Sequence, residues 1–181
     1  MITGVILGSP DGAIYVTGLG NALLRLQPEA QSTVAQSTAA QSTAAQSKAA
    51  LHDFATRYAA DWSSQDPERL ASFYIESGVL LVNDNTPATG RAAIAAKAAD
   101  FMRSFPDMFV TVDYVRNENG HVVFGWIWTG INTGPGGTGR SINIRGRERW
   151  TLSPAGRIAR SQGQYDEADY ERQMRNEPAA R

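Results

Sequence analysis

The sequence contains no cysteine and only two histidines in 181 residues. The absence of cysteine excludes disulfides, thiolate metal sites and a cysteine nucleophile, and it leaves the redox compartment open. No apolar run approaches the ~20 residues that a membrane-spanning helix needs. The formal net charge is only −1, so no excess of positive charge favours nucleic acid or an anionic membrane as partner. Groups of metal ligands at metal-binding spacing are lacking too, and we expect neither a metal nor an organic cofactor.

The first 29 residues form an apolar, glycine-rich segment with few charges. A signal peptide requires a positive start and an unbroken apolar stretch, but turn-forming residues at 8–12 interrupt this one. The apolar runs on either side, 5–7 and 14–16, are able to pair as a short hairpin. We expect this segment to stand apart from the fold of a cytoplasmic protein. Export, or a start codon placed too far upstream, are the alternatives.

Residues 30–47 are dominated by a five-residue repeat, Ala-Gln-Ser-Thr-Ala, which runs from Ala35 and ends in a variant with Lys48. A period of five matches neither the helical nor the strand repeat, so no constant apolar face builds up. Serine and threonine also offer the backbone competing hydrogen bonds. We predict a linker rather than a binding motif, followed by a domain over residues 48–176 and a tail at 177–181.

From residue 48 onward the apolar residues recur first at helical and then at strand spacing. The turn at 117–120, which ends in Asn-Gly, is typical of a hairpin between two of the strands. Helices on one face of an antiparallel sheet predict an α+β domain: a cone-shaped, curved antiparallel sheet packed against three N-terminal helices and enclosing a pocket. The expected helices are 51–62, 67–74, 90–104 and 168–174, and the expected strands are 79–82, 109–116, 122–132, 141–152 and 157–166.

A set of short motifs carries a family resemblance over residues 50–175. They are, in order, Phe105-Pro106-Asp107-Met108, residues 129–134, residues 137–140, Gly156-Arg157-Ile158, Tyr165-Asp166 and Gln173-Met174. Their order and spacing resemble those of the SnoaL-like polyketide cyclases, a family of the nuclear-transport-factor-2-like (ketosteroid isomerase-like) superfamily. The resemblance implies the cone-shaped fold, commonly as a homodimer. That superfamily includes enzymes, ligand binders and scaffolds, so the fold alone does not assign a function.

Alternation along the last strand predicts part of the pocket lining. Apolar Ile158 should face the core, which places Gln162, Gln164 and Asp166 on the same side. A bulge anywhere in the strand would reverse this assignment, because one extra residue moves every later side chain to the opposite face.

The two preceding strands add further candidate lining residues. Glu148 shares a face with Trp150, whereas the long strand has apolar residues on both faces, so the inward side of Trp126 and Trp128 is ambiguous. These tryptophans belong either to the core or dimer interface or to a pocket for a planar ligand. Tyr58, from the first helix, is a further lining residue and an available oxyanion donor, although no ketosteroid isomerase motif surrounds it.

Two carboxylates are candidates for chemistry. A carboxylate inside an apolar pocket has a raised pKa, which suits it to take a proton from the carbon beside a carbonyl. In SnoaL-like cyclases an aspartate near the end of the last strand is the acid/base, and Asp166 resembles it in position. The alternative for Asp166 is a salt bridge to a nearby arginine. Glu148 lies between Arg147 and Arg149, which favours an ion pair across the sheet.

The sequence departs from the family in its histidines. The cyclases pair their aspartate with a histidine on a neighbouring strand, but the two histidines here are His52 and His121, outside the matching strands. We therefore expect a cofactor-independent isomerase or cyclase that uses one carboxylate on a carbonyl-bearing or polycyclic compound. The alternative is a non-catalytic binding or dimerisation module. The expected partners are a small apolar or polycyclic ligand and a second copy bound through the sheet.

Overall fold

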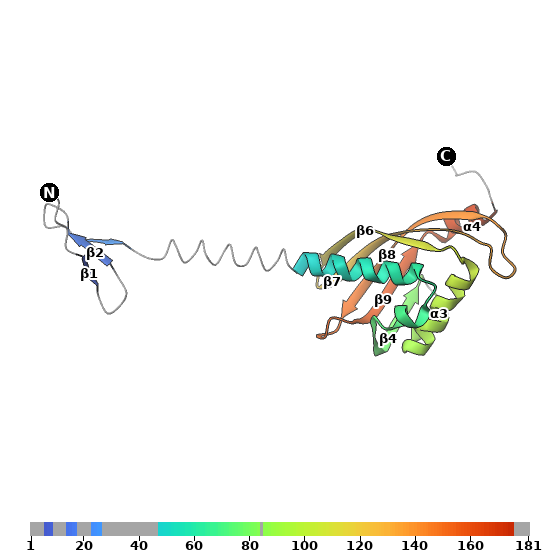
Figure 1. Cartoon of the computed structure of the whole chain (residues 1–181), viewed down its shortest axis with the longest axis horizontal. Helices are drawn as coiled ribbons and strands as arrows, with labels where there is room; N and C mark the ends of the chain where they lie inside the picture. Colours follow the sequence, from blue (N-terminus) through green and yellow to red (C-terminus); the bar gives the residue numbers. More distant parts are fainter. Residues whose placement is uncertain (1–5, 9–13, 18–22, 27–46, 84, 176–181) are drawn as a thin grey trace. The chain divides into compact units, whose positions relative to one another are not determined.

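The computed structural model describes residues 6–8, 14–17, 23–26, 47–83 and 85–175 (Figure 1). The chain divides into two compact units, Met1–Ser47 and Lys48–Arg181. Within the described residues, no helix has the length and apolar character needed to cross a membrane.

The first unit contains a three-stranded antiparallel sheet of β1 (Ile6–Gly8), β2 (Ile14–Thr17) and β3 (Leu23–Leu26). The pairing of Leu7 with Tyr15 confirms the hairpin predicted for the first two apolar runs. The third strand was not predicted. The predicted linker lies outside the described residues except for its last residue, which is helical.

A helix spans residues 47–63, as its apolar stripe predicts, and all of it except its first residue belongs to the second unit. Asp66 then caps α2 (Pro67–Ala71), because its side chain accepts a hydrogen bond from the backbone N–H of Arg69. The prediction that this helix extends to residue 74 is wrong. Tyr74 instead pairs with Ile158 in the sheet, so strand pairing overrides the local apolar spacing. Two further helices are α3 (Arg91–Ser104) and α4 (Glu167–Arg175).

The main sheet has six strands in the order β5-β4-β9-β8-β7-β6. Its neighbours are antiparallel except for β4 and β9, which run parallel and correct the expectation of a purely antiparallel sheet. The strand β4 is longer than the strand predicted at residues 79–82, and the short strand β5 was not expected. The bounds are β4 (Tyr74–Val82), β5 (Ala88–Thr89), β6 (Phe109–Glu118), β7 (His121–Ile131), β8 (Ser141–Leu152) and β9 (Ile158–Tyr165).

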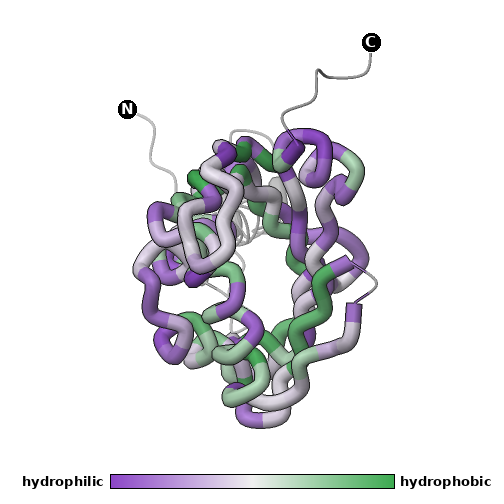
Figure 2. Tube along the Cα trace, turned by 90° about the vertical axis from the view of Figure 1, so that its right-hand side faces the viewer, coloured by the Kyte–Doolittle hydropathy of each residue, from purple (hydrophilic) through white to green (hydrophobic). Residues whose placement is uncertain are grey.

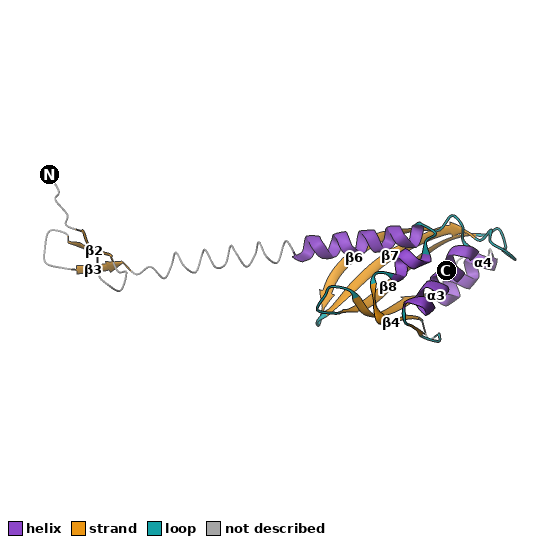
Figure 3. Cartoon of the chain, turned by 60° about the horizontal axis from the view of Figure 1, so that its bottom comes forward, coloured by secondary structure: helices purple, strands orange, loops and turns teal. Residues whose placement is uncertain are grey.

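The helix of residues 47–63 and α3 pack on the same face of this curved sheet (Figure 3). The predicted α+β class is therefore confirmed. Along β7 the even-numbered side chains are inward, so Phe124, Trp126 and Trp128 join the core, which resolves the ambiguity of this strand. Apolar and polar stretches alternate along the chain trace of this unit (Figure 2), as expected for elements that have one buried face.

Candidate active site: a buried carboxylate in an aromatic pocket

Glu148 is a buried carboxylate on the inward face of β8. Alternation along the strand places Glu148 on the same face as Ile144 and Trp150, as predicted, and Glu148 is only 6% exposed. Arg147 and Arg149 lie on the opposite, exposed face. The predicted ion pair across the sheet is therefore wrong, since the two neighbouring cations point away from the carboxylate.

Three donors converge on one oxygen of Glu148. Oε2 accepts hydrogen bonds from Tyr58 Oη at 3.0 Å, Trp150 Nε1 at 2.8 Å and Ser161 Oγ at 2.6 Å. The hydroxyl oxygens of Tyr58 and Tyr74 are 2.8 Å apart. Because Tyr58 donates its single proton to Glu148, Tyr74 must donate to Tyr58. Within the described chain, Oε1 has no hydrogen-bond partner and is the oxygen left to meet a ligand.

Burial governs the protonation of this cluster. It raises the pKa of the Glu148 carboxyl above its ordinary value, although the hydrogen bonds from Ser161, Trp150 and Tyr58 oppose the shift. Burial, together with the charge of Glu148, also raises the pKa values of Tyr58 and Tyr74 well above the usual range. The two phenols therefore remain protonated donors while Glu148 is the group that gains and loses a proton.

We expect the raised pKa of Glu148 to make stability depend on pH. The folded state holds a proton that the unfolded chain has already released, so the free energy of unfolding falls as pH rises from the ordinary glutamate range to the raised value. Above that value the loss is complete. The Glu148→Gln variant has no titrating group at this position, so it lacks this pH-dependent part of the free energy of unfolding. Urea denaturation of both proteins from about pH 4 to about pH 8 measures it, and a wild-type advantage that grows with pH would contradict the expectation.

The pocket beside Glu148 is apolar and aromatic. The empty space amounts to about 510 Å³ when the open solvent at the mouth is counted, and Glu148 is the one carboxylate that lines the pocket among the described residues. Gly146 allows one wall to form, because a Cβ there would lie 2.3 Å from the Trp126 ring. The aromatic lining consists of Trp62, Phe101, Trp126, Trp128 and Tyr165.

Among the residues that the structure describes, two polar atoms in the pocket wall are buried without a hydrogen-bond partner. They are the indole Nε1 atoms of Trp126 and Trp128, residues that are 9% and 4% exposed. An indole N–H is a donor with no acceptor capacity. Leaving such a donor buried and unsatisfied costs about 1–3 kcal/mol. A ligand that accepts hydrogen bonds from these two atoms would therefore gain binding free energy by removing that cost.

The structure brings together some of the predicted site residues and separates others. Glu148, Trp126 and Trp128 line the pocket, whereas Trp150 and Tyr58 lie behind it and contact Glu148. Two residues of the Glu148 cluster, Ser161 and Tyr74, were not predicted. A serine and a tyrosine at ordinary strand positions give no signal in the sequence, because their role depends on pairing between distant strands.

The predicted inward face of β9 is wrong beyond Ile158. The register with β8 shifts between Thr151 and Leu152, which pair with Arg160 and Ile158, so Ala159 is an extra residue. This bulge reverses the alternation. The residues placed inward are Ser161 and Gly163, while Gln162 is half-buried and Gln164 is exposed, where it accepts a hydrogen bond from Arg147.

Asp166 follows β9 and is exposed. Its Oδ1 accepts a hydrogen bond from the backbone N–H of Asp169 at 3.0 Å, so it caps the start of α4. It is not among the residues that line the pocket around Glu148. The catalytic role of Asp166 stays a prediction, and it no longer has the support of a place on the inward face of the strand.

Metal-ligating side chains do not cluster in the described part of the chain. No group of three or more histidine, aspartate or glutamate side chains gathers into a possible metal site anywhere in the described ranges. What the pocket offers chemically is a single carboxylate, tyrosine and indole donors, and aromatic surface.

Comparison with known proteins supports both the fold and the family. Residues 52–174 match the family model of SnoaL-like polyketide cyclases. Among curated proteins, none matches the sequence. Solved structures do resemble the chain: a hypothetical protein of Catenulispora acidiphila DSM 44928 with a ketosteroid isomerase-like fold, in complex with trimethylamine, is 18% identical with a TM-score of 0.61. The alignment covers 69% of this chain and 93% of that protein.

Two other solved structures have similar scores. A putative SnoaL-like polyketide cyclase from Jannaschia sp. CCS1 is 16% identical with a TM-score of 0.59, over 71% of this chain and 96% of its own. A phenazine biosynthesis-related protein from Pseudomonas aeruginosa is 16% identical with a TM-score of 0.58, over 75% and 94%. At these identities the likeness establishes the cone-shaped fold.

Proposed function

Because the chain belongs to the SnoaL-like polyketide cyclase family, we propose that it is a cofactor-independent isomerase or cyclase in which Glu148 is the acid/base. The observation that carries this proposal is the position of Glu148, which is buried, faces an apolar pocket and has no hydrogen-bond partner for Oε1 among the described residues. The substrate class is a small compound with a carbonyl group, whose apolar or polycyclic body packs on the aromatic lining.

The reaction proposed is proton transfer beside the carbonyl. Oε1 takes a proton from the carbon next to the carbonyl, and the electron pair of the broken C–H bond forms a C=C bond while the carbonyl pair moves to its oxygen. An isomerase returns the proton from Glu148 to a different carbon. A cyclase instead lets the enolate carbon attack a second carbonyl carbon of the same molecule, and the new alkoxide takes the proton back from the Glu148 carboxylic acid.

The Glu148 cluster suits this role. Tyr58, Trp150 and Ser161 hold Oε2, which fixes the carboxylate and directs Oε1 toward the bound compound. Burial raises the pKa of Glu148 above that of an exposed glutamate, so the carboxylate is a stronger base than an exposed one.

Hydrogen–deuterium exchange at carbon tests the proposal. We expect the wild-type protein to speed deuterium incorporation from D₂O into cyclic ketones such as 1-indanone and 2-cyclohexenone, with a rate that rises with pH through the raised pKa of Glu148 and then levels. NMR of the recovered ketones measures the exchange. No acceleration over buffer across a panel of monocyclic and bicyclic ketones would reject an enzymatic role for this site.

A second candidate is a non-catalytic binding module for a small cation. The aromatic faces of Trp62, Trp126 and Trp128 around Glu148 are a suitable surface for an alkylammonium group, and one structural neighbour was solved with trimethylamine. Calorimetric binding of trimethylammonium without any ketone exchange would favour this alternative. The expected homodimer through the sheet also stays a prediction.

A further inference from the structure

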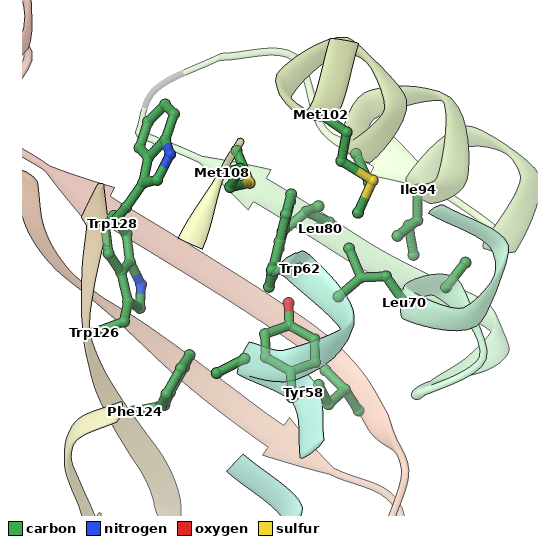
Figure 4. Packing of buried hydrophobic residues seen from close by; sticks show 14 of the residues in the cluster. Tyr58, Trp62, Leu70, Leu80, Ile94, Met102, Met108, Phe124, Trp126 and Trp128 are labelled. Carbon is green, nitrogen blue, oxygen red and sulfur yellow. The ribbon is translucent and has the colours of Figure 1, made fainter. Parts of the chain in front are cut away.

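The two unpartnered indole N–H groups lie in the same wall of the pocket. Trp126 and Trp128 alternate on the inward face of β7, and both line the cavity beside Glu148. Figure 4 shows their nitrogens on the side of the rings that faces Trp62 and Leu80, and both of these residues also line the pocket. Neither nitrogen has a hydrogen-bond partner among the described residues, and both residues are at least nine-tenths buried.

Packing fixes both rings in place. Trp128 has its ring centroid 4.8 Å from that of Phe105, edge to face, and is stacked on Tyr170 at 5.9 Å. Trp126 lies over Gly146, where a Cβ would meet its ring. The indoles are therefore unable to swing their N–H groups to solvent without disturbing the core, so the donors are held ready in the pocket.

We propose that Trp126 and Trp128 recognise the carbonyl oxygen of the ligand by donating hydrogen bonds from Nε1. The inference rests on the proposed function, because it positions the carbonyl of the compound whose neighbouring proton Glu148 removes. As that proton leaves, negative charge grows on the carbonyl oxygen, and the two N–H dipoles stabilise it. A hydrocarbon or an alkylammonium ion offers no acceptor and leaves both donors unpaired.

Indole proton NMR tests this assignment directly. The chain has four tryptophans, so four indole N–H signals are expected, and single Trp→Phe variants assign them. We expect 1-indanone to move the signal of Trp126, Trp128 or both downfield, as a new hydrogen bond does, whereas indane of nearly the same shape does not. The Glu148→Gln variant serves for these titrations, since the ketone binds there without proton transfer.

Binding of the same pair of probes provides the second measurement. We expect Trp126→Phe and Trp128→Phe each to weaken 1-indanone binding by up to about tenfold while changing indane binding little, because the substitution keeps an aromatic ring and removes only the donor. Trp62→Phe is the matched control: it alters the same pocket without removing an unpartnered donor, so the preference for the ketone should remain.

Each outcome decides the proposal. Indole signals that stay fixed with 1-indanone, or that move equally with indane, overturn it, as does a ketone preference that survives in both tryptophan variants. If a variant fails to fold, the titration of the tryptophan-intact protein still gives the answer. Downfield shifts together with no ketone exchange in the wild type would reject the proposed catalysis and leave the carbonyl recognition standing.

Discussion

Replacing Glu148 by glutamine is expected to slow ketone proton exchange by about 10²- to 10⁴-fold, the usual contribution of a general acid/base. Glutamine has nearly the same shape, and its amide oxygen can occupy the Oε2 position and keep the hydrogen bonds from Tyr58, Trp150 and Ser161. The amide nitrogen then replaces Oε1 at the pocket. The variant therefore loses the proton acceptor while retaining the fold, which circular dichroism and urea denaturation verify.

Asp166→Asn is the matched comparison, because it removes the other candidate carboxylate. Asparagine is as good a helix N-cap as aspartate, so α4 should keep its start. Exchange at the wild-type rate in this variant, with loss in Glu148→Gln, assigns the acid/base to Glu148. The reverse pattern would restore Asp166 as the catalyst and remove Glu148 from the mechanism.

Trp150→Ala is expected to lower the free energy of unfolding by about 3–5 kcal/mol, the range for deleting a large buried aromatic side chain. Trp150 is fully buried and packs against the rings of Phe54, Tyr58 and Phe124. Its indole N–H also donates to Glu148. The substitution leaves a cavity and takes one of three donors away from the carboxylate, which should raise the pKa of Glu148 further.

Urea denaturation of three variants separates the two effects. Trp150→Phe keeps most of the packing and removes the hydrogen bond, so it should cost clearly less than the alanine variant. Arg149→Ala, on the exposed face of the same strand, should stay within about 0.5 kcal/mol of the wild type. A cost below about 1 kcal/mol for Trp150→Ala would show that this residue is not part of a close-packed core.

The parts of the fold that depend on local pattern were predictable from the sequence. The apolar stripe from residue 51 to residue 62 gave the helix that supplies Tyr58. The Asn119-Gly120 turn was also recognisable, because Asn-Gly is the residue pair that best tolerates the positive φ angles of a tight hairpin. In the structure the two residues have φ angles of 50° and 79°. Simple alternation was enough to place Glu148 inward on β8, since this strand has no bulge over that stretch.

The parts that depend on distant pairing were not predictable. Whether Ala159 forms a bulge is decided by how β9 fits against β8, and that single extra residue moved Ser161 to the site and Gln162 away from it. The parallel pairing of β4 with β9 likewise turned Tyr74 from an expected helix residue into a member of the Glu148 cluster. An ion pair was the natural expectation for a glutamate between two arginines, but the sheet separates the three side chains by face.

The hydrogen bond between Tyr58 and Glu148 also bears on the order in which the protein folds, since it joins residues 90 positions apart in the sequence. Contacts of such long range form late, because the entropy of closing the intervening chain must be overcome before they contribute. A chain that has formed only its hairpins and helices still exposes this carboxylate to water, with the acidity of a free glutamate. The raised pKa of Glu148 is therefore acquired only in the last stage of folding, and partly folded chains are expected to lack the stronger base that the proposed reaction needs.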